Sequence, residues 1–82
     1  MPPRLRRLRA REVLAALRSF GFEVVATRGS HAKLRRVAGD DERQTLTVPL
    51  HKHLDPGTIR AIYRQATRFI PEAELRTWFY DD

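Results

Sequence analysis

The sequence predicts an α+β fold, a two-layer sandwich in which helices cover one face of a three-stranded antiparallel sheet. Two observations support this fold class. Segments with apolar residues at helical spacing lie on both sides of a central stretch in which β-forming and polar residues alternate. Two groups of turn-forming residues divide the central stretch into three segments. The expected order is α-β-β-β-α with a short C-terminal helix, and the second face of the sheet should be open to solvent.

The first helix is expected over residues 9–20. One side of this segment carries four apolar residues at helical spacing: Val13, Leu14, Leu17 and Phe20. Gly21 follows, and a glycine commonly ends a helix because it takes the left-handed backbone conformation without a Cβ clash. Residues 1–8 precede the helix as a basic arm. The positive charge near this end of the chain comes from five arginines: Arg4, Arg6, Arg7, Arg9 and Arg11.

Three strands are expected next, over residues 22–27, 31–37 and 45–48. Arg28-Gly29 is expected to form the two-residue turn of the first hairpin, with Gly29 supplying a positive φ. The polar residues 39–43 form a looser second turn, and Pro49 ends the third strand. Both connections are short, so neighbouring strands should run antiparallel.

Asp55 and Pro56 indicate the start of the second long helix, because Asp caps free amide groups and Pro fits the first helical position. The apolar stripe of this helix has four members: Ile59, Ile62, Tyr63 and Ala66. Pro71 interrupts the pattern, and residues 71–82 are expected to form a C-terminal helical extension. The apolar side of that extension is formed by Leu75, Trp78 and Phe79.

Composition limits the classes of function. The chain has 82 residues, which suffice for one small domain, expected to span residues 1–82. It has 16 Lys and Arg against 10 Asp and Glu, a net charge of +6, so an anionic partner is expected. The absence of cysteine excludes disulfides, thiolate zinc sites and a Cys nucleophile. No apolar run reaches the ~18–20 residues of a membrane span, and we expect a cytoplasmic protein without a deep cofactor cavity.

His31 is the candidate catalytic residue. Side chains alternate along a strand, so Ala32 and Leu34 are expected in the core. Three residues then point to the open face of the sheet: His31, Lys33 and Arg35. An imidazole beside fixed cations suits phosphodiester cleavage, because it exchanges a proton while the cations hold the charge that develops on the phosphate. RNA carries its own nucleophile, the 2′-hydroxyl. The alternative is an ordinary surface histidine among basic residues.

Other interpretations of these polar residues stay open at this point. A Ser30–His31 dyad is disfavoured, because neighbouring residues on a strand face opposite sides, and Ser30 is better explained as a turn residue. Three histidines would suffice for a zinc site: His31, His51 and His53. Alternatively, the segment from His51 through Lys52 to His53 flanks a phosphate at the amide end of the second helix, or it only connects strand and helix.

Short motifs in a fixed order give the chain a resemblance to a known family. They are Gly21-Phe22, Arg28-Gly29-Ser30-His31, Val48-Pro49-Leu50-His51, Pro56-Gly57-Thr58-Ile59-Arg60-Ala61-Ile62 and Arg64-Gln65-Ala66. Together they resemble the HicA (YcfA-like) toxins, from about Arg11 to Leu75. The resemblance implies a fold similar to double-stranded RNA-binding domains and a metal-independent mRNA interferase, the toxin of a type II toxin–antitoxin system. It also implies a HicB antitoxin as partner.

The resemblance also implies site residues. The family's catalytic histidine lies in its Gly-Ser-His motif, which corresponds to His31 here, so Gly29 and Ser30 form the turn that presents it. His51 corresponds to a histidine that recurs in the family after Val-Pro. Many members have a second histidine directly after Gly-Ser-His, where this chain has Ala32.

We therefore expect an endoribonuclease toxin that cleaves mRNA and inhibits translation, with His31 as general acid and base and with no metal or other cofactor. The residues expected to bind RNA phosphates are Arg28, Lys33, Arg35, His51 and Lys52. The expected partners are mRNA and a HicB-like antitoxin, with no membrane. The main alternative is a non-catalytic RNA-binding module that uses the same basic sheet face. A third possibility is an adaptor whose basic surface binds an acidic protein.

Overall fold

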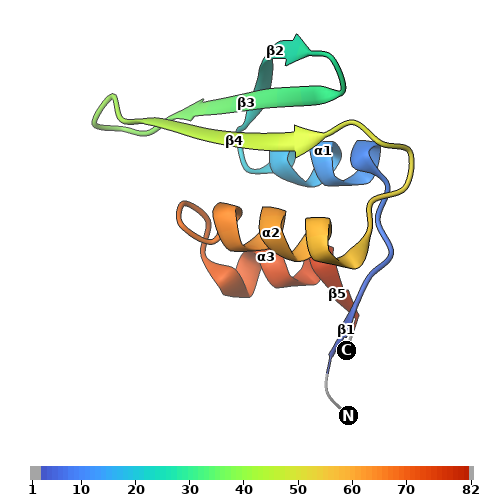
Figure 1. The fold of residues 1–82 in the computed structure, drawn as a ribbon. Coiled ribbons are helices and arrows are strands. Elements are labelled where there is room, and N and C mark those ends of the chain that lie inside the picture. The colour runs from blue at the N-terminus through green and yellow to red at the C-terminus, as the bar shows by residue number, and fades with distance from the viewer. Residues whose placement is uncertain (1–2, 82) are drawn as a thin grey trace.

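Three antiparallel strands form the central sheet: β2 (Glu23–Arg28), β3 (His31–Val37) and β4 (Arg43–Pro49), with β3 in the middle. The computed structural model describes residues 3–81. The helix α1 (Ala10–Ser19) precedes the strands, and α2 (Pro56–Ala66) and α3 (Glu72–Phe79) follow them. All three helices lie on one side of the sheet (Figure 1). The predicted α-β-β-β-α order with a C-terminal helix is therefore confirmed.

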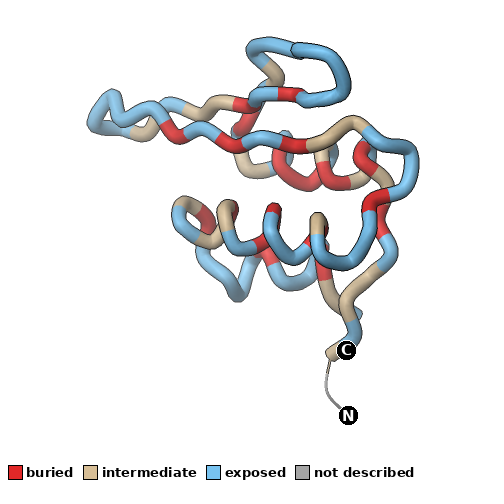
Figure 2. Tube along the Cα trace, viewed as in Figure 1, coloured by how far each residue is buried: buried red, intermediate tan, exposed pale blue. Residues whose placement is uncertain are grey.

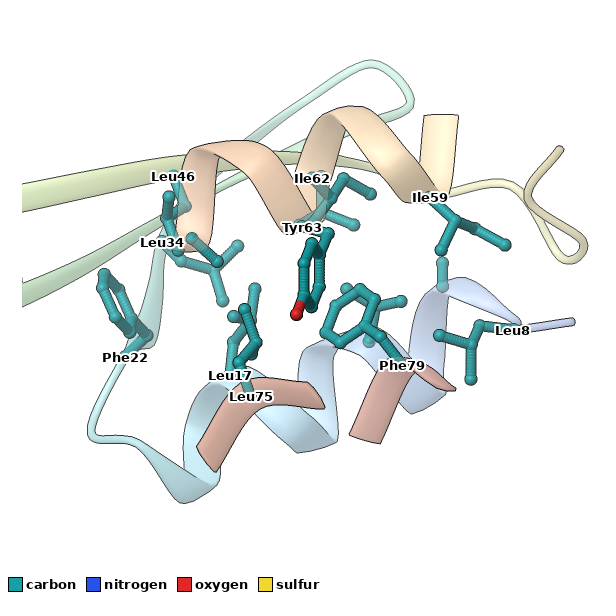
Figure 3. Close-up of a cluster of buried hydrophobic side chains, with 14 of the residues drawn as sticks. Leu8, Leu17, Phe22, Leu34, Leu46, Ile59, Ile62, Tyr63, Leu75 and Phe79 are labelled. Atoms are coloured by element: carbon teal, nitrogen blue, oxygen red, sulfur yellow. The ribbon is translucent and has the colours of Figure 1, made fainter. Parts of the chain in front are cut away.

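The core lies between the sheet and the helices, where the buried segments of the chain face one another (Figure 2). Burial alternates along β3 and β4, as the sequence predicts for strands with one covered face. Figure 3 shows side chains from both layers meeting in this core, among them Leu17, Leu34, Leu46, Ile62, Leu75 and Phe79. The opposite face of β3 and β4 is left without a covering helix.

The starts of α1 and α2 are stabilised by local side chains. Asp55 Oδ1 accepts a hydrogen bond from the backbone N–H of Thr58 at 2.7 Å, and Pro56 occupies the first helical position. This is the helix start that the sequence predicts. At α1, Glu12 Oε1 accepts a hydrogen bond from the backbone N–H of Arg9 at 2.9 Å. Both contacts satisfy backbone donors that a helix end leaves free.

The turn of the first hairpin differs from the position predicted from turn-forming residues and coincides with the turn, Gly29 and Ser30, that the family resemblance implies. Arg28 pairs with His31 in the register of β2 and β3, so the two-residue loop is Gly29-Ser30 and not Arg28-Gly29. Gly29 has a φ of +56°, which places the glycine first in the loop. The sequence pattern allows a glycine in either loop position, and only the strand register distinguishes them. The correction leaves His31 as the first residue of β3, directly after the turn.

The C-terminal helix buries a narrower stripe than predicted. Leu75 and Phe79 are fully buried, but Trp78 is 38% exposed and does not belong to the core. Leu75 and Phe79 are four residues apart and lie above one another, whereas Trp78 lies to one side of them. A helix of eight residues at the edge of a small core covers only this narrow stripe.

A two-stranded ribbon was not predicted from the sequence. β1 (Arg4–Leu5) pairs antiparallel with β5 (Tyr80–Asp81), so the N-terminal arm runs beside the C-terminal segment (Figure 1). The backbone N–H of Arg6 donates to the carbonyl of Phe79 at 2.8 Å, which extends the pairing. Residues 1–2 of the expected arm and residue 82 of the expected extension lie outside the described residues.

None of the helices in residues 3–81 combines the length and the apolar character that crossing a membrane requires.

Candidate functional site

The open face of the sheet begins at the tip of the first hairpin. On β3, His31 and Lys33 are exposed, whereas Ala32 and Leu34 between and beyond them are buried. The alternation predicted from the sequence therefore turns the imidazole and the ammonium group to the uncovered face. The chain directly after β4 holds the hairpin tip in place, because the backbone N–H of Leu50 donates a hydrogen bond to the carbonyl of Ser30. Ser30 thus acts through its backbone, as part of the turn.

Two cations lie beside His31: Arg28 is placed there by strand register, and Lys33 by its position two residues further along β3. Arg28 pairs with His31 across the hairpin, and Thr47 of β4 pairs with Lys33 on the other side. A register shift between Val24 and Ala26 determines which residues of β2 pair with the start of β3, including the pair of Arg28 and His31. A hollow of about 310 Å³ results, lined by Ala26, Arg28, His31, Ala32, Lys33 and Thr47. One imidazole and two positive side chains therefore line a single hollow.

His31 also lines a second hollow, of about 400 Å³, on the side of β4 that faces α2. Thr47 and Pro49 form its strand wall together with His31, while Gly57, Thr58 and Ala61 belong to its helix wall. His31 and Thr47 are common to both hollows. The imidazole therefore stands between the open sheet face and the N-terminal turns of α2.

The charge at the start of α2 is set by Asp55, which lines the second hollow. The backbone and side-chain hydrogen bonds from Thr58 hold the pKa of Asp55 below its ordinary value, and the nearby His51 adds to this effect. The ionised carboxylate offsets the positive end of the helix dipole. The positive charge available to an anion near His31 therefore comes from Arg28 and Lys33 on the strands.

Arg35 lies on the same face but further along β3. Its register neighbours are Glu23 on β2 and Thr45 on β4. Its Nε is buried and has no hydrogen-bond partner within residues 3–81. Arg35 lines neither of the hollows that contain His31. The structure therefore separates Arg35 from the group formed by His31, Arg28 and Lys33.

The polar side chains of residues 51–53, which follow β4, line hollows that do not contain His31. His51 and Lys52 line a hollow of about 300 Å³ with the first residues of α1, and His53 lines another beside the N-terminal arm. His31 is in neither hollow, so the three histidines do not converge. Among residues 3–81, no three His, Asp or Glu side chains are grouped so that they could hold a metal ion. The zinc arrangement considered from the sequence is therefore not formed.

Sequence reasoning missed two neighbours of His31. The sequence pattern places Thr47 only on a strand, and it places Thr58 only at the amide end of the second helix, where a phosphate was one of the alternatives. The alternation of β4 puts Thr47 on the outer face, and this much was readable from the sequence. That Thr47 pairs with Lys33, and that the first turns of α2 face His31, depends on register and packing.

A comparison with protein families identifies the chain's relatives. A family model described as the HicA toxin of bacterial toxin–antitoxin systems matches residues 10–67. The match runs from α1 to the end of α2 and includes His31, but it ends before the Leu75 expected from the sequence motifs. Neither a curated protein nor a solved structure matches the chain. Since residues 10–67 are well over half of its 82 residues, this protein belongs to the HicA toxin family of bacterial toxin–antitoxin systems.

Proposed function

We propose that this toxin is an endoribonuclease that cleaves mRNA and thereby inhibits translation, with His31 as its catalytic residue. One observation carries the proposal: His31 shares an open hollow with Arg28 and Lys33, inside the part of the chain that matches the toxin family. In this proposal His31 exchanges the proton, and Arg28 and Lys33 supply fixed positive charge. All three lie on a surface that a long polymer can reach.

The reaction proposed is transfer of the phosphodiester to the neighbouring 2′-hydroxyl. A ring nitrogen of His31 takes the 2′-hydroxyl proton while the 2′-oxygen forms a bond to phosphorus. The bond from phosphorus to the 5′-oxygen breaks, and that oxygen leaves as a hydroxyl after receiving the proton that His31 took, which returns the imidazole to its neutral form. The products are an RNA with a 2′,3′-cyclic phosphate and an RNA with a 5′-hydroxyl. The attacking group belongs to the substrate, so no protein nucleophile takes part.

Arg28 and Lys33 have the electrostatic role in this proposal. Negative charge builds up on the phosphate oxygens as the new bond forms, and positive side chains already in place stabilise it without reorganisation. Arg28 can bind two phosphate oxygens at once through its planar guanidinium group, whereas Lys33 acts as a point charge. Arg35, His51 and Lys52 lie outside this hollow, so they would bind phosphates further along the RNA.

The shape of the site favours a large substrate. The two hollows that contain His31 have volumes of about 310 and 400 Å³, at the low end of the range for ligand sites, so neither would enclose a whole RNA substrate. An RNA strand lying across the sheet face would reach His31 without entering a cavity. The cytoplasm, where mRNA is found, is the compartment that suits this activity.

Membership of a toxin–antitoxin family implies an antitoxin partner. We assign this role to a HicB-like protein. Inhibition would follow most directly if it covered the His31 hollow, because the open face of the sheet has no covering element of its own among residues 3–81.

The test is cleavage of a long single-stranded RNA by purified protein in the presence of EDTA. Wild type and the control His53→Ala, compared at saturating RNA, are expected to cut it, whereas His31→Ala is expected to bind RNA and leave it intact. Far-UV circular dichroism should be the same for all three. If wild type binds RNA but does not cut it, the protein is a non-catalytic RNA-binding module. If EDTA abolishes cutting, the metal-independent mechanism is wrong.

A further inference from the structure

A basic hollow lies between the N-terminal arm and the first turn of α2. Its volume is about 830 Å³, which is within the range of ligand-binding sites. Five arginines line it: Arg4, Arg6, Arg7 and Arg9 from the arm and its junction with α1, and Arg60 from α2. Glu12 is the one carboxylate in the lining. We call this feature the arm hollow.

The positive charge of the arm hollow is largely uncompensated. Within residues 3–81 the one ion pair is between Arg6 and Asp81, at 3.7 Å. Arg6 is further engaged, since its Nη1 donates to the carbonyl of Trp78 at 3.0 Å. The carboxylate of Glu12 accepts from the backbone of Arg9 at the start of α1. Arg4, Arg7 and Arg60 are exposed and have no acidic partner in the described chain.

The arm that carries these arginines is held in place. β1 pairs with β5, and the backbone N–H of Leu54 donates to the carbonyl of Leu8, whose side chain is buried. The arginines are therefore presented from an ordered backbone, so less conformational entropy is lost when they bind a ligand. Both β1 and β5 lie outside residues 10–67, so the ribbon is an addition to the part of the chain that matches the family.

The first turns of α2 separate the arm hollow from the hollow that contains His31. Thr58 and Ala61 face His31, whereas Ile59 and Arg60 face the arm. A strand of nucleic acid that passes from the His31 hollow over the first turns of α2 would reach the arm hollow, because both hollows are lined by residues of these turns. Such a strand carries its phosphates in series, and arginine is well suited to bind them because its guanidinium group matches their geometry.

We propose that the arm hollow is a second binding site for the phosphate backbone of the RNA, separate from the site of cleavage. The proposal rests on the proposed function. No Phe, Tyr or Trp lines the hollow, and Leu8, Leu54 and Ile59 at its floor are buried. It therefore lacks the exposed aromatic anchors typical of protein interfaces and of base stacking. Contacts to phosphates alone would make its binding independent of RNA sequence.

The experiment uses full-length His31→Ala protein, which is expected to bind RNA without cutting it. Two double variants are made in this background. One carries Arg7→Gln and Arg60→Gln, and the control carries Arg18→Gln and Arg43→Gln. Each pair removes two positive charges, but Arg18 and Arg43 are exposed residues that line none of the hollows described above. Affinity for a long single-stranded RNA is measured by fluorescence anisotropy over a series of salt concentrations.

The arm-hollow pair is expected to weaken RNA binding at least ~10-fold at low salt, and to reduce the slope of log affinity against log salt by about 1.4, because two phosphate contacts are lost. The control pair should change affinity less than ~3-fold. With a dinucleotide that spans only the His31 hollow, the two pairs should behave alike.

Equal losses for the two pairs on the long RNA would show a general charge effect and overturn the second site. Retained RNA affinity, with lost affinity for the antitoxin, would make the arm hollow a protein-binding surface instead. If the parent protein binds no RNA, the proposed function itself is wrong. RNA binding with no special role for Arg7 and Arg60 would reject the second site alone.

Discussion

Arg36 donates a hydrogen bond from Nη2 to the backbone carbonyl of Phe69 at 2.8 Å, although the two residues are 33 positions apart in the sequence. Its Nη1 donates to the carbonyl of Phe20 at 2.9 Å, and its Nε donates to Oε1 of the buried Gln44 at 2.8 Å. The same guanidinium group lies 4.8 Å from the ring centroid of Phe22. One side chain of β3 therefore joins the segments that follow α1 and α2 to the sheet.

Replacing Arg36 with Met is expected to lower the free energy of unfolding by about 2–4 kcal/mol, because two backbone carbonyls and one amide lose a charged donor. Lys33→Met is the control, since Lys33 is exposed and should change stability by less than ~0.5 kcal/mol. Urea unfolding followed by circular dichroism measures both. Equal changes in the two variants would contradict the structural role of Arg36.

Lys33→Gln is expected to reduce the rate of RNA cleavage by about 10–100-fold without affecting folding, because one of the two cations in the His31 hollow is lost. Lys52→Gln removes the same charge from a different hollow and should change the rate by less than ~3-fold at saturating RNA. Single-turnover cleavage gives both rates. A larger effect from Lys52 would mean that the scissile phosphate lies beside α1.

Gly29→Ala is expected to destabilise the fold by about 1–2 kcal/mol. No atom lies within 4 Å of the Cβ that would be added, so the cost comes only from the φ of +56°. Gly39→Ala is the control, because that position is equally open and has no left-handed φ. Thermal unfolding compares the two variants. If Gly39→Ala were the more harmful change, the cost assigned to the positive φ of Gly29 would be contradicted.

Tyr63 is expected to make the stability of the fold fall at high pH. Burial, together with the hydrogen bond that its hydroxyl donates to Glu72 at 3.0 Å, raises the pKa of Tyr63 from 10.0 to about 12. The folded state therefore binds the phenolic proton more tightly than the unfolded state. This contribution is complete below about pH 10 and is lost as the pH rises toward about 12.

The measurement is the urea midpoint of unfolding at about pH 9 and about pH 11. Tyr63→Phe should show a smaller fall between these two conditions than wild type, because it has no phenolic proton at this position. Tyr80→Phe should resemble wild type. The opposite ranking would assign the pH dependence to Tyr80 and not to Tyr63.

Local sequence patterns predicted the elements of the family-matched region well. Asp55 and Pro56 define the start of α2 through contacts between residues only a few positions apart. The alternation of His31 and Lys33 with Ala32 and Leu34 follows from the geometry of a single strand. Such features depend on near neighbours, so the sequence contains them directly. The resemblance in motifs was likewise enough to predict the family that the comparison confirms.

Other features depend on residues that are distant in sequence. The position of the first turn required the pairing of Arg28 with His31, and the exposure of Trp78 depended on how much of α3 the core can cover. The ribbon of β1 and β5 joins the two ends of the chain, whose short segments have no strand pattern of their own. Two-residue strands are stable only as part of a larger packed structure.

The sequence by itself determined the fold class, the face of the sheet that carries His31, and the membership of the HicA toxin family. Only the tertiary structure decided that Arg28 and Thr47 join Lys33 as neighbours of His31, that Arg35 does not, and that His51, Lys52 and His53 belong to other hollows. The physical reason is that periodicity fixes which way a side chain points within its own element. Its neighbours across the surface are set by strand register and by the packing of helices on the sheet, which all parts of the chain determine together.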